Sequence, residues 1–342
     1  MPTLTIREVA KIAGVSPSAV SFVLNNRVGV SEATRKKVLD IISETQFTPN
    51  RSSRRLSLKK SFNICLAINT ASSPFIDLFY FDIARGIVDA STSCDYNLIL
   101  SQLNYSKSGK KHVPSSVKNR DADGVIFLQD TPDAILKETA AMQIPFILVD
   151  AELKANETHT TVNLDSEWSC QVATNYLIKN GHRDIGFITS SYLPRYYNQT
   201  VTGFSKAMTD NKLKIRKPWI FSEAKDEITA YKGMAQILRT RQRPTAVVCA
   251  GDRYAIGAIR CVQEKGLSVP EDISFIGMDN IILSSYITPP LTTISFNAFE
   301  MGKTAFELLM KKINGEAVDS IIFPSGSIIE RSSVRNFVRK HE

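Results

Sequence analysis

The chain of 342 residues lacks several features that mark other protein classes. It has no run of about 18 apolar residues, and its start, MPTLTIREVAKIAG, has no basic segment followed by an apolar one. Its five cysteines form no CxxC pair, and its four histidines stand far apart. We therefore expect no membrane span, no secretory signal, no metal and no cofactor, and we expect reduced thiols in a cytoplasmic protein.

Sequence motifs of common enzymes are also missing. The chain contains no GxxxxGK[ST], no HExxH and no GxSxG nucleophile elbow. No aspartate stands near a base or nucleophile that the sequence reveals, so we do not expect an enzyme. The chain is 43% hydrophobic and 22% charged, which is typical of a globular protein, and its length suggests two or three domains.

The positive charge is concentrated at one end. The net charge is +8, and residues 1–60 hold 11 Lys and Arg against 4 Asp and Glu, whereas residues 61–342 hold 31 against 30. This asymmetry predicts a small domain that binds a polyanion, attached to a nearly neutral body. The alternative from charge alone is a solvated basic tail.

The first residues are patterned as helices, which argues against a tail. Thr5 and Glu8 have the spacing of a capping box, so a helix is expected to start at Thr5 and to end at Gly14. Ser16 is a suitable N-cap and Pro17 suits the first helical position of a second helix.

A third helix is predicted to begin at Ser31. The second helix is expected to reach about Leu24, and two short helices joined by a glycine turn with a supporting third describe a helix-turn-helix domain over 1–48. The residues expected on the inner faces are Ile6, Val9, Ala10, Ala13, Ala19, Val20, Val23, Leu24, Val38, Leu39, Ile41 and Ile42.

The segment TIREVAKIAGVSPSAVSFVLNNRVGVSEATRKKVLDIISETQFTPN resembles the headpiece of the lactose-repressor (LacI/GalR) family of bacterial transcription regulators. The resemblance implies that the second helix enters the major groove, where Pro17, Ser18 and Phe22 would read bases. It implies phosphate contacts at Thr5, Ser16, Ser21, Asn25 and Ser31. The alternative for Ser16 and Ser31 is that they only cap helices, and the two roles are compatible.

Phe22 departs from the polar residue that relatives usually carry there. A phenyl ring can meet a thymine methyl group but cannot read guanine as an arginine does, so we expect a preference for an A·T pair at that position. The alternative is a partly exposed ring that leans on the headpiece.

Residues 49–60, from the segment TPNRSSRRLSLKKS, are strongly basic around a central Leu56. Read alone, this stretch is a flexible basic linker, because so short a helix is unstable by itself. The resemblance implies instead a hinge helix that folds on the operator and inserts Leu56 into the minor groove. The accompanying DNA contacts would come from Asn50, Arg51, Arg54 and Arg55.

From residue 61 apolar runs alternate with helical patterns, which predicts parallel sheets covered by helices. The expected strands are 63–69, 96–103, 123–129, 146–150, 184–189, 246–251 and 272–279. Ligands of such folds bind at the carboxyl ends of strands, where Asp150, Asp252 and Asp279 stand, although a lone strand-end aspartate is often only a helix cap.

Segments such as ADGVIF, IPFILVD and KGLSVPEDISFIGMDN extend the resemblance over the body. It implies an α/β core with two lobes, like a periplasmic binding protein, and an effector in the cleft. The N-lobe would comprise 61–162 and 293–323, and the C-lobe 163–290 and 324–342. Three crossovers between lobes would form a hinge that closes on a ligand.

The body departs from the family's ligand-binding pattern. Thr200 replaces a usual arginine, Gly251 a usual asparagine, and Lys225 an aromatic residue in a loosely aligned region. Three readings stay open: an unusual or phosphorylated effector held by Lys225 and Arg195, a sugar held by other residues, or no small molecule and control by a protein partner. The expected effector contacts are Phe75, Asp150, Trp168, Arg195, Tyr196, Thr200, Lys225, Asp252 and Asp279, with Tyr197 as a further aromatic.

The expected partners are double-stranded operator DNA with a near-palindromic sequence, a small-molecule effector such as a sugar or sugar phosphate, and a second copy of the chain. The end VRNFVRKHE has no leucine heptads, so a homodimer is expected rather than a tetramer. Effector binding would shift the lobes and thereby change operator affinity. Two other classes of protein fit the sequence less well. A secreted binding protein would need a secretory signal, and an architectural DNA-binding protein without sequence preference would not need a two-lobed body.

Overall fold

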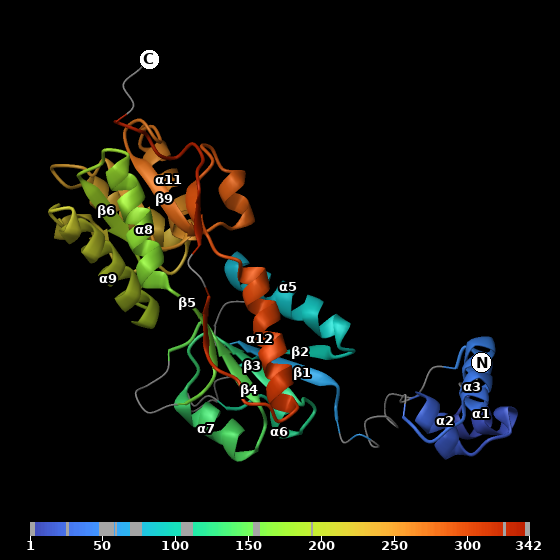
Figure 1. Cartoon of the computed structure of the whole chain (residues 1–342). Helices are drawn as coiled ribbons and strands as arrows, with labels where there is room; N and C mark the ends of the chain where they lie inside the picture. The colour runs from blue at the N-terminus through green and yellow to red at the C-terminus, as the bar shows by residue number, and fades with distance from the viewer. Residues whose placement is uncertain are drawn as a thin grey trace. The chain divides into compact units, whose positions relative to one another are not determined.

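The computed structural model describes residues 4–24, 27–47, 58, 60–68, 77–103, 112–152, 158–192, 194–323 and 326–338. It divides into two compact units, Met1–Phe62 and Asn63–Glu342, which we describe separately as the headpiece and the core (Figure 1). The predicted contacts of Asn25, Asn50, Arg51, Arg54, Arg55, Leu56 and Phe75 lie outside the described residues. Within the described ranges, no helix is long and apolar enough to cross a membrane.

The headpiece begins with the predicted capping box. The Thr5 hydroxyl accepts a hydrogen bond from the Glu8 backbone N–H at 3.3 Å, and the Glu8 carboxylate accepts one from the Thr5 backbone N–H at 2.6 Å. Helix α1, Ile6–Ala13, then ends at Gly14, which has φ 63°. Helix α2, Pro17–Leu24, begins after Ser16, whose hydroxyl accepts from the Ala19 N–H at 3.1 Å. The expected starts and the glycine turn are confirmed.

Helix α3, Glu32–Thr45, is capped by Ser31 as predicted and completes a small core. The buried members of that core are Val9, Ala10, Ala13, Val20, Val23, Val38 and Phe47. The prediction that Leu39 points inside is wrong, because its side chain is 48% exposed. Consecutive residues of a helix are about 100° apart, so Val38, Ile41 and Ile42 share the inner stripe while Leu39 lies beyond its edge.

The N-lobe of the core is a six-stranded parallel sheet with the order β11-β5-β4-β3-β1-β2. Its strands are β1 Asn63–Ile68, β2 Asn97–Gln102, β3 Gly124–Leu128, β4 Phe146–Val149, β5 Thr161–Leu164 and β11 Ile321–Phe323. Helices α5, Leu78–Ser93, and α12, Ala298–Ile313, lie side by side on one face (Figure 1). Helices α6, Ser115–Lys118, and α7, Asp133–Ala141, pack on the other face.

The C-lobe repeats this architecture with the strand order β12-β10-β9-β8-β6-β7. Its strands are β6 Ile185–Ile188, β7 Ile220–Phe221, β8 Ala246–Cys249, β9 Ser274–Asp279, β10 Thr292–Ser295 and β12 Ser327–Ile329, the last of which is antiparallel. Helices α8, Ser166–Lys179, and α9, Pro194–Asp210, cover one face, and α10, Glu227–Leu238, and α11, Asp252–Glu264, cover the other. Two short 3-10 helices, η1 Lys217–Trp219 and η2 Ile282–Ser285, complete the lobe.

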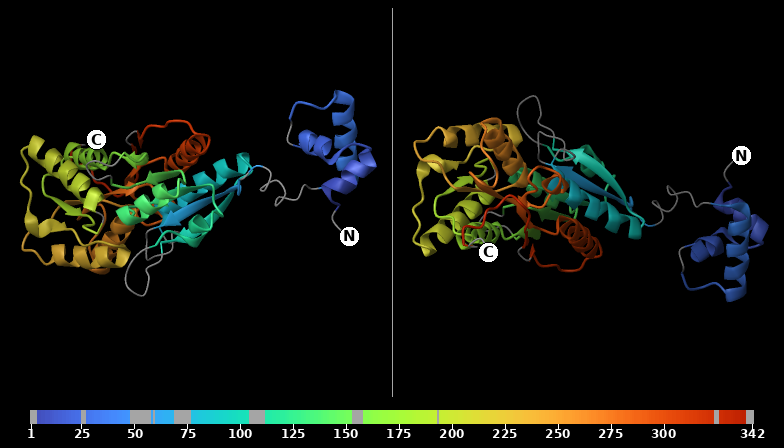
Figure 2. Two further views of the ribbon diagram at one scale, coloured as in Figure 1. Left: turned by 90° about the horizontal axis from the view of Figure 1, so that it is seen from below. Right: turned by 90° about the horizontal axis from the view of Figure 1, so that it is seen from above.

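At two of its three crossings the chain passes between the two sheets a few residues later than predicted. The third crossing, expected after residue 323, falls between β11 and β12 as predicted. Figure 2 shows the core from two further sides. The expected boundary at 162 falls inside β5, which pairs with N-lobe strands as far as Leu164. The expected return at 293 falls inside β10, which pairs with β9 of the C-lobe as far as Ser295. Both predicted boundaries were too early. Each strand continues its hydrogen-bonded pairing for a few more residues before the chain leaves the sheet.

Candidate DNA-binding surface and effector cavity

Most of the described headpiece residues expected to touch DNA are accessible to solvent. Thr5, Ser16, Pro17, Ser18 and Ser31 are exposed, and Ser21 is half-buried. Ser16 and Ser31 cap α2 and α3, so two helix N-termini with backbone N–H groups open onto solvent beside them. Their contacts with phosphate and bases stay predictions.

Phe22 rests against its own headpiece. A Cβ atom placed on Gly29 would lie 3.2 Å from the Phe22 ring, and Gly29 has φ 117°. The Arg27 N–H donates to the Phe22 carbonyl at 2.8 Å and begins the loop that carries Gly29. Gly29 therefore gives the ring a place to lean, as the alternative interpretation of Phe22 requires, while the half-buried side chain keeps part of its edge accessible.

A cavity of about 640 Å³, its open mouth included, lies in the core and is lined by both lobes. The lining residues are Asp77, Phe79, Tyr80, Asp150, Leu164, Ser166, Tyr196, Lys225, Ala250, Gly251, Arg253, Tyr254, Asp279, Ile281 and Phe296.

The N-lobe wall is built at the start of α5 and the end of β4. Asp77 caps α5 by accepting from the Phe79 N–H at 3.1 Å. The next residue, Tyr80, donates from its hydroxyl to the Asp150 carboxylate at 2.5 Å. The Phe79 ring meets those of Tyr80 and Phe296 edge to face. The hydrogen-bonded Tyr80 and Asp150 and the rings of Phe79 and Phe296 therefore form one connected side of the cavity.

The C-lobe contributes the start of α9. The Arg195 guanidinium lies 3.3 Å from the Asp150 carboxylate and donates to the Leu164 carbonyl at 2.9 Å, so it contacts the N-lobe twice. Tyr196 donates to the carbonyl of Ala250, which places its ring beside the end of β8. These contacts tie α9 to both lobes at the cavity.

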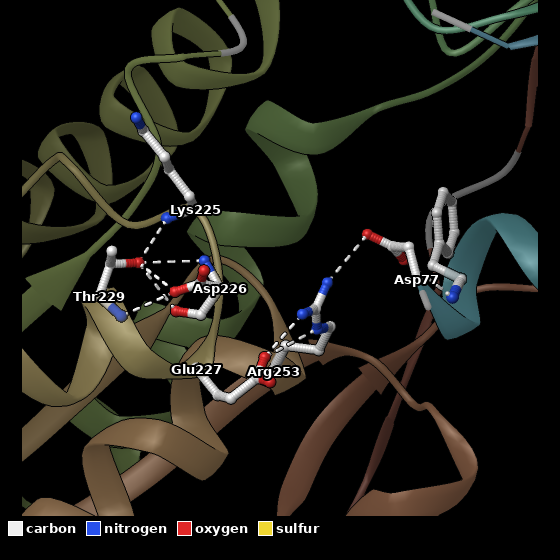
Figure 3. A network of polar contacts seen from close by, with 7 residues as sticks. Asp77, Lys225, Asp226, Glu227, Thr229 and Arg253 are labelled. Carbon is white, nitrogen blue, oxygen red and sulfur yellow. Dashed lines mark hydrogen bonds and ion pairs between the residues drawn. The ribbon is translucent and has the colours of Figure 1, made fainter. Parts of the chain in front are cut away.

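Arg253, near the start of α11, forms the second bridge between the lobes. Its guanidinium lies 2.6 Å from the Glu227 carboxylate and 3.7 Å from that of Asp77 (Figure 3). Glu227 begins α10, which Asp226 caps through Thr229 at 2.7 Å. The arginine is thus held between one carboxylate from each lobe.

Lys225 lines the cavity, but its cation is directed elsewhere. The Nζ atom lies 3.7 Å from the centre of the Tyr192 ring, a cation–π contact, and the side chain is exposed. Figure 3 shows the side chain pointing away from Arg253 and Asp77, while its backbone N–H donates to the Thr229 hydroxyl at 2.8 Å.

Burial controls the protonation of the cavity. Desolvation raises the pKa of Asp77 and Asp150, and for Asp150 the nearby Arg195 opposes the rise. The pKa of Asp279 is raised well above its ordinary value by desolvation and then by the charges of Asp252 and Asp77. Desolvation raises the pKa of Tyr254 to about 12, so its hydroxyl stays protonated and can donate hydrogen bonds at neutral pH.

Four predicted effector contacts, Asp150, Tyr196, Lys225 and Asp279, line the cavity, and Arg195 touches it through Asp150. Three others do not line it. Thr200 is buried against Thr189, hydroxyl to hydroxyl at 3.0 Å, and Trp168 is partly exposed in the first turn of α8.

Asp252 is the third that lies outside the lining. Its carboxylate is fully buried and accepts from the hydroxyls of Thr293 and Ser284, both at 2.6 Å, and from the Ile281 N–H at 3.0 Å. These bonds join α11 to β10 and η2, so the Asp252 carboxylate is engaged within the C-lobe and does not line the cavity.

Sequence reasoning missed Asp77, Phe79, Tyr80, Arg253, Tyr254 and Phe296 as lining residues. Arg253 and Tyr254 directly follow Asp252, and their position just after a strand was the sequence signal that could have identified them as lining residues. The N-lobe residues carried no such signal, because α5 reaches the cavity only through the packing of the lobes.

The two α/β lobes around a shared cavity, together with the helix-turn-helix headpiece, define a transcription regulator with a periplasmic-binding-protein-like core. Residues 5–50 match the family of bacterial regulatory proteins, lacI family, and residues 174–334 match a periplasmic binding protein-like domain. The chain belongs to the LacI family of bacterial regulatory proteins, which includes DNA-binding transcriptional repressors.

Curated relatives match over nearly the whole chain. Catabolite control protein A of Priestia megaterium is 32% identical over 93% of this chain and 95% of the relative. The repressor PurR of Pasteurella multocida is 33% identical over 97% and 99%. A solved structure of the Lac repressor dimer bound to operator and the anti-inducer ONPF has a TM-score of 0.79 and 26% identity over 97% of this chain and 99% of that one.

Proposed function

We propose that the protein represses transcription as a homodimer on a near-palindromic operator, and that a small molecule in the interlobe cavity controls its operator affinity. The observation that carries this proposal is the lining of the cavity by both lobes, with Asp150 on one side and Tyr196 and Asp279 on the other. A ligand that contacts both lobes stabilises the arrangement that fits it best.

Control of DNA affinity follows if the two lobe arrangements hold the headpieces differently. The effector then shifts the equilibrium by as much as its affinities for the two arrangements differ. Two related structures contain bound small molecules and so support a small-molecule ligand: the Lac repressor with ONPF and operator, and a LacI-family regulator from Enterococcus faecium with bound ribose, 25% identical to this chain.

Exposed apolar side chains support the homodimer. Ile282, Leu283 and Tyr286 in and after η2 are 61%, 46% and 77% exposed. Phe81 and Val88 form a second exposed stripe on α5, two turns apart. Apolar groups gathered in this way mark an interaction surface, and a two-fold axis doubles the DNA contacts of a single headpiece.

The test selects the operator from random duplexes with the full chain and then measures its affinity with and without sugars, amino sugars, sugar phosphates and nucleosides. We expect a dimer by light scattering, specific binding that weakens steeply with salt, and one class of ligand that changes operator affinity. Equal affinity for selected and random DNA would refute the repressor proposal.

The alternative is control by a protein partner without a small molecule, which the relative named catabolite control protein A favours. Under that alternative, the whole ligand panel leaves the thermal midpoint and the operator affinity unchanged. Under the main proposal, a bound ligand at about 100 times its Kd adds about 2.7 kcal/mol to the free energy of unfolding.

A further inference from the structure

We propose that the effector carries a positive charge, an amine or a quaternary ammonium group, which binds beside Asp279 among the aromatic rings of the cavity. This inference rests on the proposed function, since it names the chemical class of the ligand for the same cavity. Two observations support it. The cations around the cavity are already engaged by other groups, and the Asp279 carboxylate has no cation beside it among the described residues.

The two arginines at the cavity are already neutralised. Arg253 lies between Glu227, at 2.6 Å, and Asp77, at 3.7 Å (Figure 3). Arg195 pairs with Asp150 at 3.3 Å and also donates to a backbone carbonyl. A phosphate would have to compete with these carboxylates, so neither arginine is an open anion site.

The third cation faces out of the cavity. The Lys225 ammonium lies over the Tyr192 ring, both side chains are exposed, and water screens the charge there. Figure 3 shows Lys225 directed away from the Arg253 bridge. One of the alternatives predicted from the sequence was an anionic effector held by Lys225 and Arg195. In the structure both cations are already engaged by other groups.

Asp279 is the carboxylate that lacks a cation. It ends β9 and lines the cavity, and none of the lysines and arginines in the described ranges forms an ion pair with it. The carboxylates of Asp252, Asp77 and Asp150 contribute to its raised pKa, and a backbone N–H of Asp252 donates a hydrogen bond to it. Desolvation and these neighbouring charges favour the protonated form of Asp279, and a ligand cation beside it would favour the ionised form.

Aromatic rings complete a site suited to an ammonium group. Tyr196 and Tyr254 come from the C-lobe, and Phe79 and Phe296 meet edge to face at 6.5 Å between ring centres. The faces of such rings attract cations, and most strongly where water is excluded. A neutral polyol could hydrogen-bond Asp279 and the tyrosine hydroxyls but would bring no opposite charge to the carboxylate.

The experiment compares ligands that share a shape and differ in charge, using the full chain and isothermal titration. One pair is choline and the neutral alcohol in which a tert-butyl group replaces the trimethylammonium group. A second set is glucosamine, glucose and a glucose phosphate. We expect the cationic member of at least one set to bind about tenfold more tightly than its neutral counterpart, and the phosphate to bind most weakly.

Two variants identify the carboxylate responsible. Asp279→Asn keeps the shape and an acceptor oxygen but removes the charge, and it is expected to abolish the preference for the cation. Asp210→Asn removes the same charge from the exposed end of α9 and is expected to leave the preference unchanged. An unchanged preference in Asp279→Asn overturns the inference.

The outcomes separate this inference from the proposed function. If a neutral or anionic ligand binds most tightly and also releases or captures operator, the proposal of a cationic effector is wrong. The proposal of a ligand-controlled repressor then still holds. Cation binding without any change in operator affinity supports the site and contradicts the proposed control. A panel that binds nowhere overturns both.

Discussion

The Arg195 guanidinium of α9 lies 3.3 Å from the Asp150 carboxylate at the end of β4 and joins the two lobes across the cavity. Both side chains are only 14% exposed, so neither charge is well solvated without the other. Tyr80 donates to the same carboxylate and orients it toward the arginine.

Replacing Arg195 is expected to destabilise the core. Arg195→Gln leaves Asp150 buried with only the Tyr80 hydroxyl, and we expect the free energy of unfolding to fall by about 2–3 kcal/mol in urea denaturation. The matched control is Arg85→Gln, whose pair with Asp82 is exposed, with an expected loss of less than about 0.5 kcal/mol. Equal losses in the two variants would contradict the assigned role of the interlobe pair.

Asp252→Asn tests whether this carboxylate is structural. An amide cannot accept all the bonds from Thr293, Ser284 and Ile281, so we expect a loss of about 2–4 kcal/mol in the free energy of unfolding. Because Asp252 does not line the cavity, the variant at a temperature where it is folded should bind the same ligands as the wild type. A selective loss of ligand binding with unchanged stability would restore Asp252 to the list of effector contacts.

His182 predicts a loss of stability in mild acid. Its two ring nitrogens lie 3.0 Å from the Thr245 hydroxyl and 3.1 Å from the Arg335 carbonyl, and desolvation lowers its pKa to about 4. The unfolded chain, with a pKa of about 6.5, binds the proton first, so the stabilisation is complete above that pH and is lost as pH falls toward 4.

The expected size of this effect is about 2–3 kcal/mol between those limits. The comparison is the unfolding free energy of wild type and His182→Gln at several pH values, so that the buried carboxylates contribute equally to both. The difference between the two proteins should shrink as the solution is acidified, and a constant difference would show that His182 does not titrate as described.

The apolar patch at η2 predicts the oligomeric state. Leu283→Glu places a charge on the exposed patch with Ile282 and Tyr286 and is expected to convert the dimer to a monomer at micromolar concentration, seen by light scattering. Ile228→Glu is the control, because Ile228 is as exposed as Ile282 but belongs to α10 and not to η2. A dimer that survives Leu283→Glu and dissociates in Ile228→Glu would place the interface elsewhere.

Phe22 predicts a base preference. We expect selection of the operator to return an A·T pair opposite Phe22, and Phe22→Arg to shift the preference toward G·C by about 1–3 kcal/mol. Circular dichroism of Phe22→Ala separates a lost contact with Gly29 from a lost DNA contact, and Ile12→Ala, exposed on α1, is the control. A guanine at that position in the wild-type selection, or an unchanged consensus in Phe22→Ala, would leave the ring with its structural role alone.

Several elements could be predicted because their causes are local. The Thr5 and Glu8 capping box, the Ser16 and Ser31 caps and the Gly14 turn involve residues within a few positions of one another. The apolar strands followed by Asp150 and Asp279 also revealed the edge of each sheet where the cavity forms. The resemblance to a known family then predicted that these local units assemble into two lobes.

Other features depended on which distant residues meet. Asp252 and Asp279 both follow or end buried strands, yet one is enclosed by Thr293 and Ser284 and the other lines the cavity. Sequence spacing places both at the same sheet edge and cannot give the direction of either side chain, which the packing of η2 and β10 sets.

By itself, the sequence determined the headpiece helices, the alternation of strands and helices and the strand-end aspartates, because hydrogen bonds and apolar periodicity within a few residues specify them. Only the tertiary structure decided that Arg195 pairs with Asp150, that Arg253 bridges Glu227 and Asp77, and that Asp279 lacks a cation among the described residues. The physical reason is that charge pairing depends on distance in space, and the folding of two lobes against each other brings these groups within a few ångströms across long stretches of chain.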